Sequence, residues 1–217
     1  FIEDIVETQA LSSLRKFYTD DAGHALAKQV DTDLIQLGRT AGSGTAYSTA
    51  ATTTNAFIGS NGTTVYNSTS SNAAALTDAA IRRTIQRLDD ADVPMTDRML
   101  IVPPSTRNTL MGIARFTEQS FVGEQGSANT IRNGLIGDVY GVKVYVTTNA
   151  DAGAGNSGAD RICLMAHKDA FCLAEQMGVR SQTQYKQEWL ATLFTSDMLY
   201  GVAELRDSSA VALAVPA

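Results

Sequence analysis

The first 37 residues place apolar side chains at helical spacing, with Gly23 as their only glycine and without proline. A helix has 3.6 residues per turn, so apolar positions three or four apart lie along one side of it. The pattern predicts one helix over residues 1–37, which Gly38 ends as a C-cap. The spaced residues are Ile2, Val6, Leu14, Tyr18, Leu26, Val30 and Leu34.

A stretch without charged side chains runs from Thr40 to Thr77. Its sequence AFIGSNGTTVYN has two β-prone runs on either side of Asn61 and Gly62. Asn-Gly favours a two-residue type I′ hairpin loop, in which both central residues have positive φ. We therefore expect a β-hairpin with a type I′ turn, in which Gly62 is a structural turn residue.

Helix and strand signals alternate in the next segment. Thr77 is a suitable N-cap for a helix over residues 78–91. The apolar run 99–102 predicts a buried strand, and two prolines end it because proline has no N–H for the sheet. Ser105 is then the expected N-cap of a helix that continues to Phe116.

The remaining sequence predicts mostly strands. Val142, Val144 and Val146 alternate with Lys143 and Tyr145, as in a strand with one buried side. Helices and strands mix without a regular βαβ order, which predicts an α+β fold. We further expect strands at 160–166, 178–188 and 195–215, a short helix or turn at 168–175, and structural turns at Gly137 and Gly141.

The chain of 217 residues is acidic, with a formal net charge of -6. This charge provides no general attraction to nucleic acid or to anionic membranes. No apolar run approaches the roughly 18 residues of a membrane span, and no basic-then-apolar leader opens the sequence. Cys163 and Cys172 match neither a redox motif nor zinc-binding spacing, so we expect two buried free thiols.

The candidate catalytic motifs all lack their required surroundings. Residues 153–158, GAGNSG, match the glycine fingerprint of dinucleotide-binding proteins. That fingerprint needs a following helix whose N-terminus receives the phosphates, whereas the next sequence, ADRICLM, predicts a strand. A nucleophilic triad would need His24 or His167, and Ser105 has no Gly-x-Ser-x-Gly surroundings. We expect no catalytic residue and no cofactor.

Three acidic residues, Asp89, Asp90 and Asp92, stand near the end of the helix predicted over 78–91. Their surroundings lack the glycine and the distal glutamate of an EF-type calcium loop. We therefore expect no metal here. An ion pair with Arg98, or with an arginine of a neighbouring subunit, is the expected role.

Four sequences, in order, resemble the major capsid proteins of tailed bacteriophages. LDDADVPMTDRMLIVPPSTRNTLM is similar to the segment in which an acidic helix end and Val-Pro lead through Arg into a strand. IRNGLIGDVYGVKVYVTTN is similar to the family's glycine-punctuated strand pair, and MAHKDAFCLAEQ to the strand and turn beyond it. YGVAELRDSSAVALAV resembles its last strands, so the likeness covers nearly the whole chain.

The resemblance implies the Hong Kong 97-type coat fold, an α+β fold with a long spine helix. Residues 1–38 and 178–217 would form its peripheral β-rich domain, and residues 39–177 its mixed axial domain. The implied function is that of a structural subunit, not an enzyme, of an icosahedral capsid around double-stranded DNA. The implied partners are copies of the chain in hexamers and pentamers, scaffolding and portal proteins, and DNA bound without sequence specificity. The implied location is the virion, assembled in the host cytoplasm without a membrane.

Three alternatives stay open. A shell protein of an encapsulin-type nanocompartment shares the fold but encloses enzymes, and the neighbouring genes would distinguish it from a phage protein. A soluble α/β enzyme would need a deep pocket near Ser105 or Gly153. A fibre or adhesin module, which the uncharged stretch suggests, would need β-repeats that the sequence lacks.

The family's N-terminal arm and extended two-stranded loop have no counterpart before the predicted spine helix, and Phe1 lies inside an amphipathic pattern. We therefore expect an N-terminally truncated chain that folds but does not close shells. The missing parts supply contact area between subunits, and a stable interface needs more than about 1,000 Å². Light scattering and native mass spectrometry should show monomers or small oligomers, and closed particles of uniform diameter would contradict this expectation.

Overall fold

Two compact units divide the chain. The smaller unit consists of residues 1–33 and 173–202, and the larger of residues 34–172 and 203–217. The peripheral and axial domains expected from the resemblance stay a prediction, because compactness does not tell which place a unit takes in a shell. The computed structural model describes residues 2–9, 14–38, 56–67, 71–113, 137–150, 152–154 and 160–217.

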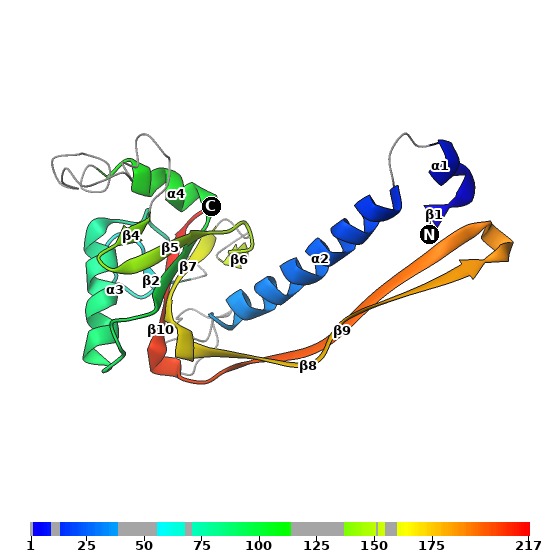
Figure 1. Cartoon of the computed structure of the whole chain (residues 1–217). Coiled ribbons are helices and arrows are strands. Elements are labelled where there is room, and N and C mark those ends of the chain that lie inside the picture. The colour runs from blue at the N-terminus through cyan, green and yellow to red at the C-terminus, as the bar shows by residue number, and fades with distance from the viewer. Residues whose placement is uncertain are drawn as a thin grey trace, which may run out of the picture. The chain divides into compact units, whose positions relative to one another are not determined.

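The smaller unit is built around two long paired strands (Figure 1). β8 (Phe171–Lys186) and β9 (Ala191–Glu204) have 16 and 14 residues, whereas strands in globular proteins usually have roughly 3–10. β1 (Ile2–Glu3) pairs with β9, so the strands lie in the order β1-β9-β8. We call β8, β9 and the 3₁₀ turn Gln187–Trp189 between them the ribbon.

Two helices belong to the N-terminal segment, α1 (Asp4–Gln9) and α2 (Leu14–Leu37). The prediction of one helix from residue 1 is wrong at its start, because Ile2 and Glu3 are extended and pair with β9. This pairing satisfies backbone groups that a helix N-terminus leaves open, and it buries the Ile2 side chain. The end of the predicted helix at Leu37 is confirmed.

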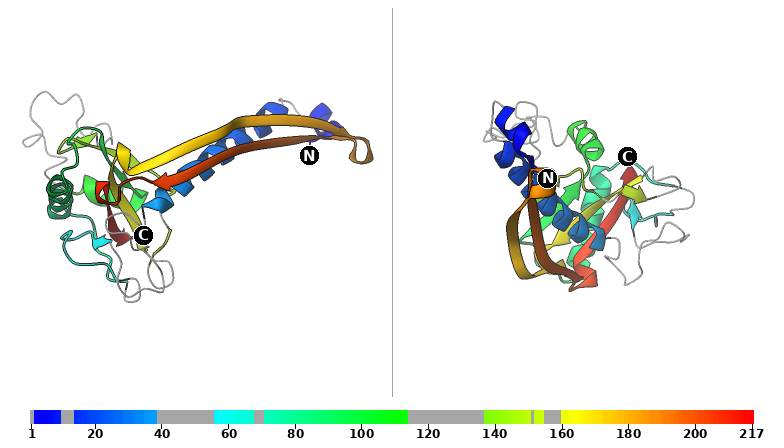
Figure 2. Two further views of the ribbon diagram at one scale, coloured as in Figure 1. Left: turned by 90° about the horizontal axis from the view of Figure 1, so that it is seen from below. Right: turned by 90° about the vertical axis from the view of Figure 1, so that its right-hand side faces the viewer.

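α2 runs beside the ribbon, as the views in Figures 1 and 2 both show. Ala22, Leu26 and Val30 are half-buried at steps of four residues, in agreement with the sequence pattern. Tyr200 of β9 donates a hydrogen bond to the Asp33 carboxylate at 2.5 Å. This bond raises the pKa of the Tyr200 phenol, because the carboxylate favours the protonated hydroxyl.

The larger unit is a mixed sheet with helices packed on it (Figure 1). Its strands lie in the order β2-β10-β7-β3-β5-β4, with β6 paired to β7. β2 is parallel to β10 and β3 to β5, and the other described pairs are antiparallel. The strands at the two ends of this order, β2 and β4, have two residues each.

The elements of the larger unit are β2 (Phe57–Ile58), α3 (Asp78–Asp90), β3 (Arg98–Val102), α4 (Pro104–Met111), β4 (Asp138–Val139), β5 (Val142–Val146), β6 (Ala152–Ala154), β7 (Asp160–His167) and β10 (Ala210–Pro216). The predictions of α3 with its N-cap Thr77, of β3 and of β7 are confirmed. Thr77 caps α3 by accepting a hydrogen bond from the Ala80 N–H.

Side chains of β7 alternate between the two sides of the sheet. Cys163 and Met165 pack on one side with residues of β3, β10, α3 and α4. Ile162 packs on the other side with alanines of β10 and with Tyr66. Successive side chains of a strand point in opposite directions, so an apolar strand of this kind needs cover on both sides. The Tyr66 hydroxyl also donates to the buried Asp160 carboxylate at 2.6 Å.

Gly38 follows α2 as predicted, and its role is close packing. A Cβ at this position would lie 2.8 Å from both methyl groups of Leu164 and 3.0 Å from the carbonyl oxygen of Ile35. Real Cβ atoms do not come as near as 2.8 Å, so a larger residue would push Leu164 of β7 aside. Glycine therefore lets the end of α2 lie directly against the sheet.

The type I′ turn occurs at Tyr140 and Gly141, which join β4 to β5. Their φ angles are 52° and 78°, and Val139 pairs with Val142 across them. Positive φ at both central residues is the mark of this turn type. Gly137, also predicted as a structural turn, has neither a positive φ nor any atom within 4 Å of an added Cβ.

The prediction of a type I′ turn at Asn61-Gly62 is wrong. Phe57 and Val65 form an antiparallel bridge around a longer loop. Gly62 has a positive φ of 64°, whereas Asn61 does not have one. Gly62 instead fits against α3, where a Cβ would lie 3.1 Å from the Ala80 carbonyl oxygen. Packing against the helix has therefore decided the loop geometry over the local preference of Asn-Gly.

The helix after β3 begins and ends differently from the prediction. Pro103, and not Ser105, is the N-cap residue of α4. The Ser105 hydroxyl donates instead to the Pro216 carbonyl oxygen at 3.3 Å. α4 ends at Met111, and the predicted end at Phe116 lies outside the described residues.

Two predictions near the C-terminus also need correction. The predicted strand 195–215 is two strands, β9 and β10, which lie in different sheets with the 3₁₀ turn Asp207–Ser209 between them. The predicted turn at 168–175 is limited to Lys168–Ala170, since β8 begins at Phe171. Apolar residues continue through both junctions, so the sequence pattern alone does not mark where one strand stops.

We predict that Gly38→Ala lowers the free energy of unfolding, because the added methyl group meets Leu164. Overpacking of a core costs about 1–3 kcal/mol. The matched change Gly23→Ala, in α2 with nothing within 4 Å of an added Cβ, should raise stability by about 0.5–1 kcal/mol. Urea unfolding followed by circular dichroism measures both, and a neutral Gly38→Ala would contradict the close contact.

Candidate assembly surface

The smaller unit has almost no hydrophobic core of its own. Among the described residues, Ile2 and Ala191 are its only buried apolar side chains, whereas three clusters of core residues lie in the larger unit. Ten of the sixteen large apolar side chains that are exposed among the described residues belong to the smaller unit. They are Ile5, Val6, Phe17, Tyr18, Leu173, Val179, Tyr185, Trp189, Leu190 and Leu199.

This distribution points to contact with other molecules. Single exposed apolar side chains are normal, but a monomer rarely leaves so many of them together on one unit. Val179 on β8 is 60% exposed and Phe17 on α2 is 65% exposed. We call these ten side chains the apolar surface of the smaller unit. The sequence showed the amphipathic helix, but not that so little of its apolar side is covered within the chain.

Polar contacts fix the geometry of the ribbon. Arg180 of β8 donates two hydrogen bonds to Asp197 of β9, at 3.2 and 2.6 Å. Tyr185 donates to the Asp4 carboxylate of α1 at 2.9 Å. These hydrogen bonds raise the pKa values of Arg180 and Tyr185, because a carboxylate favours the protonated partner. All four side chains are exposed to water, so the bonds set register more than they stabilise the fold.

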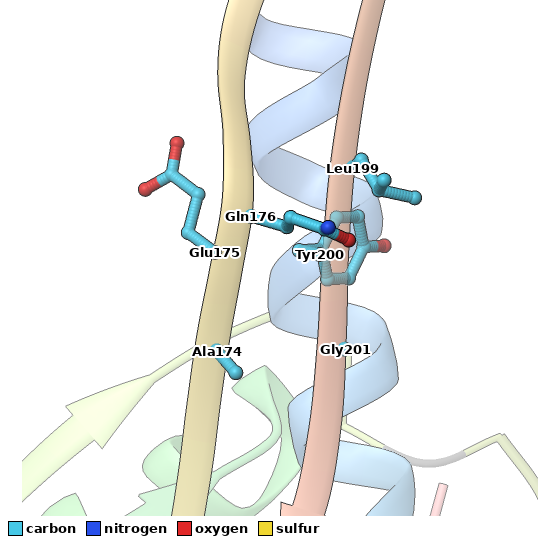
Figure 3. A pocket seen from close by; sticks show the side chains of 6 residues that line it. All are labelled: Ala174, Glu175, Gln176, Leu199, Tyr200 and Gly201. Atoms are coloured by element: carbon cyan, nitrogen blue, oxygen red, sulfur yellow. The ribbon is translucent and has the colours of Figure 1, made fainter.

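Two shallow hollows lie on the smaller unit. One, of about 260 Å³, is formed by residues of α1 and contains the carboxylate of Asp4. The other, of about 520 Å³, lies on the ribbon. Figure 3 shows Gln176 directed toward Tyr200 there, with Glu175 pointing away. Each hollow is lined by a single carboxylate, so neither offers the convergent acid, base and nucleophile of a hydrolytic site.

In the larger unit, the structure pairs one member of the predicted acidic cluster, Asp89, with Arg98. Arg98 is 3% exposed and lies 2.7 Å from the Asp89 carboxylate. Its guanidinium also donates to the carbonyl oxygens of Pro94 and Val93, at 2.8 and 2.6 Å. Arg98 therefore ties the end of α3, the turn after it and the start of β3 together.

The other two acids of the cluster, Asp90 and Asp92, are exposed and stay candidates for contacts with other subunits. A neighbouring ion pair was missed by the sequence analysis. Lys168 donates to Asp97 at 2.6 Å, which lowers the pKa of the Asp97 carboxyl and raises that of Lys168. The partners are 71 residues apart in sequence, so no local pattern could have indicated this pair.

His167 and Cys163, two of the reactive residue types considered above, are buried and have structural partners. His167 is buried at the end of β7, where its Nδ1 accepts from the Asp169 N–H at 3.2 Å. His24 is exposed on α2. Cys163 is buried beside Thr106, and burial raises the pKa of its thiol to about 12, which keeps it protonated and unreactive at neutral pH. Cys172 is only half-buried, so the prediction of burial is correct for Cys163 alone.

The glycine sequence 153–158 is only partly described, since residues 155–158 lie outside the described ranges. β6 covers its start, and a strand, β7, follows it as predicted. In the part of the chain that the structure describes, no three His, Cys, Asp or Glu side chains are grouped to hold a metal ion. None of the described helices is both long and apolar enough to cross a membrane.

A model of the family described as phage capsid protein matches residues 3–209. The chain belongs to the phage capsid protein family. It is a structural subunit of a capsid, a coat protein of the virion. No curated protein matches the sequence.

Solved structures similar to this capsid protein include two from phages. The capsid of the cyanophage P-SCSP1u has a TM-score of 0.70 at 19% identity, covering 99% of this chain and 70% of that chain. Mycobacterium phage Che8 gives a TM-score of 0.69 at 19% identity, with 98% and 67% covered. The holo-SrpI encapsulin complex of Synechococcus elongatus gives 0.54 at 10% identity, with 99% and 71% covered. These likenesses confirm the Hong Kong 97-type coat fold.

We predict that Arg98→Leu destabilises the larger unit by about 2 kcal/mol or more, because it leaves the carbonyl oxygens of Val93 and Pro94 without their buried donor. Asp89→Asn keeps an acceptor for Arg98 and should cost about 1 kcal/mol. Asp92→Asn makes the same chemical change at an exposed position and should stay within about 0.5 kcal/mol of the parent.

Urea unfolding of the three variants measures these differences. An Arg98→Leu variant as stable as Asp92→Asn would show that the buried guanidinium does not hold the turn after α3.

Proposed function

We propose that this capsid protein forms the hexamers and pentamers of an icosahedral tailed-phage shell that encloses double-stranded DNA. The observation that carries the proposal is the apolar surface of the smaller unit, whose ten side chains are exposed in the single chain. Repeated packing of identical subunits buries such surface at every copy. Membership of the capsid family supports the same arrangement.

We also propose that the spine helix and long strands, within residues 1–38 and 178–217, belong to the peripheral domain, and residues 39–177 to the axial domain. α2, with 24 residues, and the 14-residue β9 are the long elements that such a peripheral domain needs. Most of residues 39–177 lie in the larger unit, whose sheet is covered on both sides and supplies a compact body for the axial position. β10 pairs with β7 in this sheet, although it lies within residues 178–217.

The negative net charge of the chain supports a shell that does not bind its packaged DNA tightly. At a net charge of -6, the protein repels the phosphate backbone on average, and no sequence-specific DNA contact is needed. Scaffolding and portal proteins are proposed as further partners during assembly in the host cytoplasm. The role is structural throughout, without catalysis.

The encapsulin likeness supports a second candidate, a nanocompartment shell that encloses enzymes. The two candidates share a fold and differ in content. Particles purified from cells should therefore contain nuclease-protected DNA if the shell is that of a phage, and cargo protein without DNA if it is a nanocompartment.

Assembly through the apolar surface can be tested in the complete coat protein. Val179→Asp on β8 and Phe17→Ser on α2 should each lower the yield of closed particles severalfold, because both put polar atoms where subunits are proposed to meet. Negative-stain electron microscopy and sedimentation of lysates measure the yield. Folding should be retained, since changes at exposed positions usually alter stability by less than about 0.5 kcal/mol.

Met95→Ser is the matched control. Met95 is 75% exposed and belongs to the larger unit, outside the apolar surface of the smaller unit. Its particle yield should equal that of the parent protein. Full assembly of Val179→Asp and Phe17→Ser would contradict a role for this surface in subunit contacts.

A further inference from the structure

The dipeptide Asn61-Gly62 is prone to a chemical reaction that the function of the shell does not use. Glycine has no side chain to hinder its nitrogen when this attacks the preceding asparagine side chain. The Gly62 N–Cγ bond forms, the Cγ–Nδ2 bond breaks, and ammonia leaves with the proton of the amide. Water then opens the cyclic imide at either carbonyl and yields aspartate or isoaspartate. Asn61 is exposed, so water and hydroxide reach it.

Three hydrogen bonds hold the Asn61 carboxamide in place. Its Oδ1 accepts from the backbone N–H groups of Thr63 and Thr64, at 2.9 and 3.0 Å. Its Nδ2 donates to the Thr64 hydroxyl at 2.9 Å. This is a local turn of the kind that asparagine favours, in which the side chain binds the backbone just after it.

The attacking nitrogen is held as well. Gly62 N donates to the Ile58 carbonyl oxygen at 3.0 Å. The Gly62 carbonyl oxygen accepts from Arg87 Nε at 3.2 Å, and the same guanidinium lies 3.7 Å above the centre of the Phe57 ring. Gly62 is buried against α3, with a virtual Cβ 3.3 Å from Ala80 Cα. The loop is therefore fixed at its carboxamide, its nitrogen and its carbonyl.

Two effects of this geometry oppose each other. The N–H donors on Oδ1 draw electrons away from Cγ, which by itself favours attack. Attack also requires the 61–62 peptide to turn toward Cγ and the Gly62 nitrogen to lose its proton, which breaks the bond of Gly62 N to Ile58. In the docked loop, Arg87 opposes this turn because it holds the Gly62 carbonyl oxygen of the next peptide, so that bond has to be released as well. Breaking both bonds and the contact with Ala80 is a local opening of the structure. Polarisation of Cγ acts only after that opening, so the opening controls the rate.

We propose that Asn61 is a latent deamidation site, which reacts only when the loop 58–64 leaves α3. Isoaspartate at this position adds one carbon to the backbone. The loop then cannot restore both the Ile58 and the Arg87 bonds of Gly62, so one reaction leaves it permanently undocked. Aspartate is milder, because it loses only the donor to Thr64.

The test measures deamidation of Asn61 by peptide mapping with mass spectrometry at mildly alkaline pH. In the folded parent protein the rate should be at least about tenfold lower than in the same chain unfolded in urea. Thr64→Val removes the acceptor of Nδ2, and Arg87→Lys removes the planar group that binds Gly62 and stacks on Phe57. Each should raise the folded-state rate about two- to tenfold, as expected for loss of one hydrogen bond.

Two matched controls make the same substitutions outside the contacts. Thr63→Val changes a hydroxyl that takes no part in the bonds to Asn61, and Arg82→Lys changes an exposed arginine of α3 that pairs with Asp78. Both should deamidate at the parent rate, and all five proteins should react equally in urea. Circular dichroism verifies folding, and if Arg87→Lys does not fold, the exposed Thr64→Val decides. Equal rates for folded and unfolded parent, or for test and control variants, would overturn the proposal.

Discussion

The smaller unit cannot be stabilised by its own burial, and this constraint governs the rest of the capsid protein. Apolar surface contributes about 25 cal/mol for each Å² removed from water. Within the described residues of this unit, only Ile2 and Ala191 are fully buried apolar side chains, and others such as Leu26 are half-buried. A ribbon of two strands is marginally stable alone in water. Cross-strand bonds such as Arg180 to Asp197 set its register, and burial has to come from other subunits.

The larger unit differs from the smaller one, because its own elements cover its sheet on both sides. One side depends on α3 and α4, and the other on the uncharged segment around Tyr66 and on the end of α2 at Gly38. Among the described residues of this segment, Ala56 and Tyr66 pack against β7 and β10, which explains the lack of charge around them. A charge there would have to be buried or would push the segment off the sheet. The Tyr66 hydroxyl donates to the buried Asp160 carboxylate at the start of β7, which gives this acid a partner.

The sequence predicted best those features that depend on local pattern. α3 with its cap Thr77 and the strand β3 follow from neighbouring residues. The alternation in β5 holds for Val142 and Val144, whereas Val146, predicted on the same buried side, is exposed. Features decided by distant contacts were missed. The strand character of Ile2 comes from β9, 190 residues away by the register Ile2 to Thr192. Asn61-Gly62 does not form the type I′ turn that its sequence prefers, because Gly62 packs against α3. Tyr140-Gly141, which has a weaker sequence signal, forms that turn.

The same limit applies to the candidate site. Arg98 and Asp89 lie close enough in sequence to be paired by inspection, whereas Lys168 and Asp97 do not. The apolar surface was hidden because periodicity shows which side chains share one side of a helix, not whether anything covers that side. The spacing of apolar residues in α2 is the same whether that side of a helix is covered within the chain or only by another subunit.

The short strands at the two ends of the larger sheet have a consequence for solubility. β2 and β4 have two residues each, so they present few unpaired backbone groups in a row. A long flat edge would let one chain add to the next without limit, which is the start of fibrous aggregation. A coat protein has to accumulate to high concentration before and during assembly. Because the edge strands are short, association through side-chain contacts is favoured. Such contacts have a defined geometry and can form a closed shell.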